Sequence, residues 1–111
     1  DSLENYKCGT EQFIRLLSEN VKREHNVDFY ADKLCISSQY LGRIVRNFGH
    51  DKVYDIIARA VVGEIEIMLA DSSIPLKQIA TDMNFSDQSV FTKFFKRQTG
   101  MSPLQYRNTL K

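Results

Sequence analysis

The side chains best suited to recognition chemistry lie in two short stretches of the sequence, 38–47 and 88–97. A helical projection of the second stretch, at about 100° per residue, separates a polar side from an aromatic side. The polar side holds Ser89, Thr92, Lys93, Lys96 and Arg97, and the aromatic side holds Phe91, Phe94 and Phe95. We therefore expect a helix that buries the three phenylalanines and exposes amide, hydroxyl and basic groups.

The first stretch has the same arrangement 50 residues earlier. Its polar side holds Gln39, Gly42, Arg43, Arg46 and Asn47, and its apolar side holds Leu41, Ile44, Val45 and Phe48. Each stretch thus begins with small or amide-bearing residues and has a basic residue one turn further on. The two helices are predicted to present matching surfaces.

These residue types, in this order along a helix, suit contact with the major groove of duplex DNA. Short polar groups near a helix N-terminus can approach base edges, and Arg and Gln can make bidentate contacts with bases. Basic residues further along can meet phosphates. A single amphipathic surface helix would be weak support, but two matching copies favour DNA. The predicted contact residues are Ser38, Gln39, Arg43, Arg46, Gln88, Ser89, Thr92, Lys93, Lys96 and Arg97.

Apolar spacing and capping residues predict an all-α fold of seven helices, without a strand. The first expected helix runs from Thr10 to about residue 26, with a core face of Phe13, Ile14, Leu17 and Val21. The next three are a short helix at 29–34, a helix from a Ser37 cap to about Phe48, and a long helix at 52–70. The last three are a short helix at 76–84, a helix from a Ser86 or Asp87 cap to Gly100, and a helix that begins at Ser102-Pro103. Gly49 and His50 are the expected turn before the long central helix, which 19 residues would make about 28 Å long.

Residues 31–46 and 80–96 repeat one pattern, in which a short helix, a tight turn and a longer second helix follow one another. This is the helix-turn-helix arrangement. The sequence therefore predicts two helix-turn-helix subdomains joined by a long central helix.

Composition is compatible with one compact domain and sets limits on its chemistry. The 111 residues are 42% hydrophobic and 26% charged, with a net charge of +1. From Gln88 onward there are basic residues and no Asp or Glu, so positive charge is concentrated at the C-terminal end. Cys8 and Cys35 are too few for a disulfide framework, and Cys35, between Leu34 and Ile36, is expected to be buried. No membrane span or signal peptide is predicted.

Other chemistries find little support in the sequence. His25 and His50 have no metal-ligand partners at suitable spacing, and Glu64 and Glu66 point in different directions on a helix. The serines that precede helices are expected to be caps, and the phenylalanines to be core rather than a platform for single-stranded bases. We predict no enzymatic activity, no metal and no cofactor.

Residues 79–107 closely resemble the AraC/XylS family of bacterial transcription regulators. The shared marks are Ile79-Ala80, Phe85-Ser86, Phe95-Lys96, Gly100-Met101-Ser102-Pro103 and Tyr106-Arg107. Residues 31–41 match the family's first unit. The resemblance implies that both second helices enter adjacent major grooves of double-stranded DNA. It also implies a cytoplasmic regulator with RNA polymerase as a further candidate partner.

The same resemblance predicts the domain organisation. Residues 1–9 would be a linker remnant and 10–111 the DNA-binding domain, with helix-turn-helix units at about 29–50 and 76–100 and a linker helix at about 52–70. The chain begins at Asp1 without Met, and most family members carry a separate sensing or dimerising domain, so we expect one here. Tyr106 would pack the last helix while Arg107 braces it.

Three features depart from the family pattern. Gly49 lies one place before the usual Gly, and Val61 and Ile65 replace common Arg and Ala residues. Gly42 stands where a long base-contacting side chain is common, so the first unit is expected to read fewer bases. Two alternatives remain open: a helical protein-interaction module that has lost DNA binding, and an accessory domain of a DNA-repair methyltransferase, which would need a nucleophilic Cys elsewhere.

Overall fold

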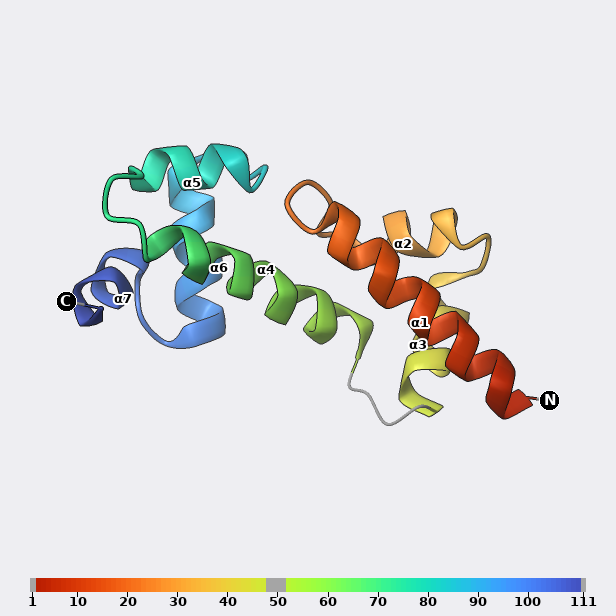
Figure 1. Ribbon diagram of the computed structural model, residues 1–111. Coiled ribbons are helices and arrows are strands. Elements are labelled where there is room, and N and C mark those ends of the chain that lie inside the picture. Colours follow the sequence, from red (N-terminus) through yellow and green to blue (C-terminus); the bar gives the residue numbers. More distant parts are fainter. Residues whose placement is uncertain (1, 48–51, 111) are drawn as a thin grey trace. The chain divides into compact units, whose positions relative to one another are not determined.

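The computed structural model describes residues 2–47 and 52–110, and these residues form seven helices and no strand (Figure 1). The helices are α1 (Ser2–Asn20), α2 (Val27–Lys33), α3 (Ser38–Asn47), α4 (Val53–Leu69), α5 (Leu76–Asp82), α6 (Gln88–Thr99) and α7 (Pro103–Thr109). The all-α prediction is confirmed. Phe48, and the turn predicted at Gly49 and His50, lie outside the described residues.

The chain forms two compact units, residues 1–60 and 61–111, and the division falls within α4. The predicted central helix is therefore present, and each of its ends agrees with the prediction to within one residue. Val53, Ile57, Val61, Ile65 and Leu69 are buried along its length. No described helix is long and apolar enough to cross a membrane.

The first unit packs α1, α2 and α3 around an aromatic centre. Tyr30 of α2 is fully buried, and its ring lies edge-on to Phe13 of α1 at 5.6 Å between centroids. The Tyr30 hydroxyl donates a hydrogen bond to the Glu24 carbonyl over 2.7 Å. Burial of this hydroxyl raises the pKa of Tyr30 to about 12. Leu41, Ile44 and Val45 of α3 are also buried, so α3 is held by its apolar side as predicted.

The prediction for the first helix was wrong at both ends. Helix α1 begins at Ser2 and ends at Asn20, so residues 2–9, expected as a linker remnant, are helical, and Thr10 is a buried mid-helix residue instead of a cap. Gly9 lies where α1 approaches α3 closely, because a β-carbon there would stand 3.2 Å from two Ile44 side-chain atoms. Ile14, predicted as core, is 41% exposed.

The second unit packs α5, α6 and α7 around phenylalanine side chains. Phe91 and Phe95 of α6 are fully buried, together with Ile79 and Met83 of α5. Phe95 also lies edge-on to Tyr106 of α7 at 5.7 Å between centroids. Phe94, predicted as core with its two neighbours, is only half-buried, against Phe85 at 5.4 Å. It lies on the flank of the helix, between the buried and polar sides.

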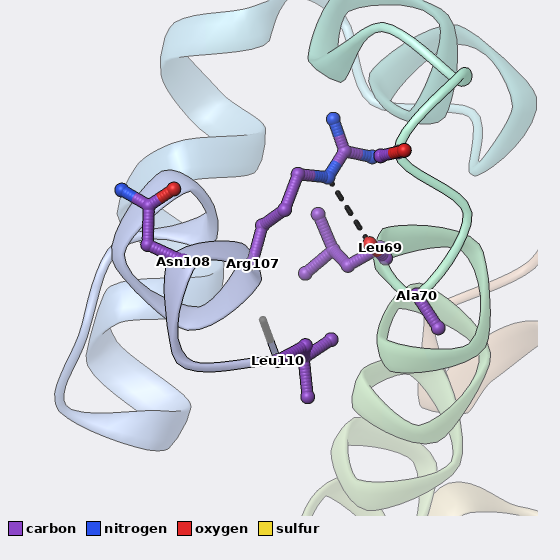
Figure 2. Close-up of a pocket in the computed structure, with 6 residues that line it drawn as sticks. Leu69, Ala70, Arg107, Asn108 and Leu110 are labelled. Carbon is purple, nitrogen blue, oxygen red and sulfur yellow. Dashed lines mark hydrogen bonds between the residues drawn. The ribbon is translucent and has the colours of Figure 1, made fainter.

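Arg107 joins α7 to the segment that follows α4. Its Nε donates to the Leu69 carbonyl over 3.0 Å, and its Nη2 donates to the carbonyls of Asp71 and Ile74 over 3.2 and 2.7 Å. Figure 2 shows this side chain crossing from α7 to the last turn of α4. A guanidinium suits this position because the last carbonyls of a helix lack intrahelical partners and carry partial negative charge. The expected bracing role of Arg107 is thus confirmed.

Candidate nucleic-acid interface

Helix α6 is fixed at both ends by its own capping residues. The Asp87 side chain accepts a hydrogen bond from the Val90 backbone N–H over 2.8 Å, so Asp87 rather than Ser86 is the N-cap. At the other end Gly100 adopts φ +85°, the left-handed conformation that favours glycine at a helix C-terminus. The caps fix where the helix begins and ends. Because Phe91 and Phe95 are buried, the opposite side of the helix faces solvent.

That outward side carries the predicted contact residues of the second unit. Gln88, Ser89, Lys93, Lys96 and Arg97 are exposed, and Thr92 is half-buried beside them. No hydrogen bond or ion pair occupies these side chains within the described part of the chain. Helix α6 contains no acidic residue. The polar groups of these six side chains are therefore accessible to a ligand, on a helix whose charged residues are all basic.

Helix α3 offers a similar but smaller surface. The Ser37 hydroxyl accepts from the Tyr40 backbone N–H over 3.0 Å, which confirms Ser37 as the cap. Gln39 and Arg43 are exposed, and no hydrogen bond holds their side chains within the residues described. At Gly42, between them, a β-carbon would meet nothing within 4 Å. The place of a long contacting side chain is thus open and unfilled.

Other polar groups of α3 are already engaged within the protein. The Ser38 hydroxyl donates to Oδ1 of Asp28 over 2.6 Å. Arg46 Nε donates to the Gly42 carbonyl over 3.3 Å, and Asn47 Nδ2 donates to the Arg43 carbonyl over 2.8 Å. Both of these contacts fold a side chain back onto its own helix. The first unit therefore presents fewer available donors than the second.

The two turns that precede α3 and α6 start alike and differ in length. Cys35 and Asn84, 49 residues apart, both adopt positive φ, 60° and 61°. The residue after each donates a backbone hydrogen bond to the carbonyl of Ala31 or Ala80. The caps Ser37 and Asp87 are 50 residues apart, so the second turn is one residue longer. Cys35, predicted to be buried, is exposed because it is a turn residue.

Two exposed apolar residues were missed by the sequence-based prediction. Tyr40 is 39% exposed and Val90 is 44% exposed, each in the first turn of its helix and 50 residues apart. Apolar side chains at such positions can contact the methyl group of thymine. The repeat itself could have identified them, since both are apolar residues next to a predicted contact residue.

The remaining titratable groups bear on two further properties, metal binding and pH sensitivity. The described residues hold no cluster of three or more His, Cys, Asp or Glu side chains that could bind a metal ion. Burial lowers the pKa of His25, in the connection between α1 and α2, which favours the neutral imidazole there. The hydrogen bonds that Asp71 accepts from Ser73 lower its pKa, and they shape the turn after α4.

Comparison with known proteins gives consistent matches. The helix-turn-helix domain family matches residues 30–109. The regulatory protein SoxS of Escherichia coli (strain K12) is 28% identical over 100 residues, which are 90% of this chain and 94% of SoxS. The transcriptional activator RhaR of Escherichia coli O1:K1 is 24% identical over 88% of this chain but only 35% of RhaR.

Solved structures show the same fold. The C-terminal domain of AraT, a response regulator from Geobacillus stearothermophilus, superposes with a TM-score of 0.82 at 20% identity, over 91% of this chain and 84% of that domain. The two named relatives are a regulatory protein and a transcriptional activator. The chain thus belongs to the AraC/XylS family of transcription regulators, as a helix-turn-helix domain that binds DNA.

Proposed function

We propose that the chain recognises one asymmetric site on double-stranded DNA, with α6 and α3 in adjacent major grooves. The observation that carries this proposal is the matched pair of polar surfaces on two capped helices, each held by a buried apolar side. The site would be asymmetric because the two surfaces differ. Gln39 and Arg43 of α3 correspond in the repeat to Ser89 and Lys93 of α6.

Within this proposal α6 makes the larger contribution to base recognition. Gln88, Ser89, Thr92 and Lys93 lie in its first two turns and would contact base edges, while Lys96 and Arg97 would hold phosphates. On α3, Gln39 and Arg43 would contact bases and Arg46 a phosphate, after release from the Gly42 carbonyl. Ser38, held by Asp28, would contribute least.

Selection of binding sites from random duplexes tests this function directly. We expect enrichment of one asymmetric sequence with two conserved segments about one helical turn apart. Binding should weaken steeply with salt, because neutralised phosphates release counterions. Failure to enrich any sequence, with no salt-dependent binding to generic duplex DNA, would contradict the proposal.

The wider setting of the domain follows from its relatives and is part of the same proposal. RhaR is named a transcriptional activator, and activation acts on RNA polymerase, so we include RNA polymerase as a second partner. Because the match covers 35% of RhaR, we also propose a separate sensing or dimerising domain in the full protein, and action in the bacterial cytoplasm. A shift of the DNA complex by added RNA polymerase on a selected site tests the second partner.

A further inference from the structure

An open hollow of the second unit lies beside the beginning of α6. Lys77 and Thr81 of α5, Ser86 and Asp87 of the turn, and Gln88 of α6 all line it. Its volume is about 420 Å³, more than ten times the roughly 30 Å³ that one water molecule occupies in the liquid. The hollow can therefore take a phosphate group with part of its hydration shell, next to a predicted base-contacting residue.

Lys77 is the cation among the residues that line this hollow. Its side chain is exposed, and neither a hydrogen bond nor an ion pair occupies it within the described residues. The acid in the hollow, Asp87, accepts the Val90 backbone N–H as helix cap. The Thr81 hydroxyl donates to the Lys77 backbone carbonyl over 3.1 Å. The Lys77 ammonium group thus has a place for an anion and no partner of its own.

The first unit carries the opposite charge at the same place. Helices α2 and α5 both have seven residues, and their second residues, Asp28 and Lys77, are 49 positions apart, as are the positive-φ residues that follow each helix. Asp28 is exposed, and its carboxylate accepts the Ser38 hydroxyl over 2.6 Å. One fold position therefore holds a free cation in one unit and an anion beside the DNA-facing helix in the other.

We propose that Lys77 binds a backbone phosphate of the DNA and that Asp28 denies the first unit the equivalent contact. This inference rests on the proposed function and adds a residue that the sequence pattern did not identify. A phosphate contact beside Gln88 would fix the register of α6 along the duplex without reading any base. The carboxylate of Asp28 would repel a phosphate at the corresponding place, so the second unit would dominate the salt-dependent affinity.

Three variants at α5 test the contact by fluorescence anisotropy over a range of salt concentrations, on a selected site and on a random duplex of equal length. Lys77→Met should weaken both complexes by the same factor and reduce the slope of log K against log salt by about 0.9. Lys77→Arg should keep the wild-type slope. The double variant Lys77→Gln with Gln78→Lys keeps the net charge and moves the cation one residue, out of the hollow.

The double variant separates a contact from a general charge effect. We expect it to behave like Lys77→Met. Wild-type binding by the double variant, or an unchanged salt slope for Lys77→Met, would overturn the inference. If the wild-type chain itself bound duplex DNA without salt dependence, the proposed function would fail instead, so the two failures are distinguishable.

The first unit supplies the reciprocal test. Asp28→Lys should tighten both complexes and steepen the salt slope by about one contact, while Asp28→Asn, which retains an acceptor for Ser38, should tighten them less. Thermal melting of each variant checks that the fold is kept. Weaker binding by a folded Asp28→Lys variant would show that the carboxylate assists recognition, and would overturn its assigned role.

Discussion

Lys93 and Lys96 stand one turn apart on the exposed side of α6, and we expect them to differ in function. Lys93 lies in the second turn of the helix, where we expect it to reach a base edge. Lys93→Ala should cost about 1–3 kcal/mol of binding free energy at preferred sites and relax the preference at one base pair. Lys96→Ala should weaken all sites alike, because a phosphate contact carries no sequence information.

Affinities on the selected site, on single-base variants of it and on random DNA measure this difference. Gln98→Ala, an exposed residue of the same helix outside the predicted contact set, is the matched control and should leave binding unchanged. If Lys93→Ala and Lys96→Ala lose the same affinity on specific and random DNA, the assigned division between bases and phosphates is wrong.

His25 gives the first unit a pH dependence of stability. Burial lowers the pKa of its imidazole below the ordinary 6.5, so the unfolded chain binds this proton at higher pH than the folded chain does. The stabilisation is complete above about pH 6.5 and is lost as the pH falls from there through the folded-state pKa. Urea unfolding from about pH 5 to about pH 8 should show this loss, and His25→Gln should reduce it. Parallel pH profiles for the two proteins would contradict the assignment.

At the scale of the element, α6 is held by two of its three phenylalanines. Phe95 is fully buried and touches Tyr106 of α7, so Phe95→Ala should lower the free energy of unfolding by about 3–5 kcal/mol. Phe94 is half-buried, and Phe94→Ala should cost clearly less because less contact area is lost. Denaturant unfolding compares the two variants. Equal losses would mean that Phe94 belongs to the core after all.

Arg107 stabilises the end of α4 and the turn that follows it. Arg107→Ala removes three hydrogen bonds to carbonyls and should destabilise the protein by roughly 2–4 kcal/mol, since bonds to charged groups contribute about 1.5–3 kcal/mol each and water replaces some of them. Arg107→Lys should recover only part, because an ammonium group lacks the planar fork. Full recovery by lysine would show that charge at the end of α4 matters more than the three bonds.

Elements with local signals were predictable from the sequence. Helix α6 has a cap, a glycine at its end and clear periodicity, and its predicted bounds agree with the structure. The predicted start of α1 is wrong because it rested on the capping type of Thr10, whereas Thr10 is buried within the helix, next to Gly9, which meets Ile44 of α3, 35 residues away. The predicted burial of Cys35 is wrong for a related reason. Its apolar neighbours in the sequence suggested burial, whereas its position in the turn exposes it.

At the scale of the whole molecule, the repeat predicted two matching surfaces with a smaller role for the first, and the structure shows which side chains differ in availability. The side chains of α6 are available, whereas Ser38, Arg46 and Asn47 of α3 are engaged within the protein. Such pairings depend on rotamers and on the residue opposite, which periodicity does not contain. Gly42 was the one feature of the sequence that predicted a smaller role of α3 in base recognition. The two units also differ in the turn before the second helix, which is one residue longer between α5 and α6 than between α2 and α3.

Under the proposed function, the spacing of the two DNA segments would depend on α4. This helix is continuous over 17 residues, about 26 Å at 1.5 Å per residue. Inserting about five base pairs between the segments would turn one of them to the opposite side of the duplex, since B-DNA repeats every 10–10.5 base pairs. If α4 stays rigid, the first unit cannot follow this rotation.

Binding to the inserted site should therefore fall to the affinity that α6 supports alone. The double variant Gln39→Ala with Arg43→Ala should then cause no further loss on the inserted site, although it weakens binding to the original one. Footprinting should show protection at both segments before the insertion and at one afterwards. Full affinity on the inserted site, or protection of a single groove on the original one, would mean that α3 does not take part in recognition.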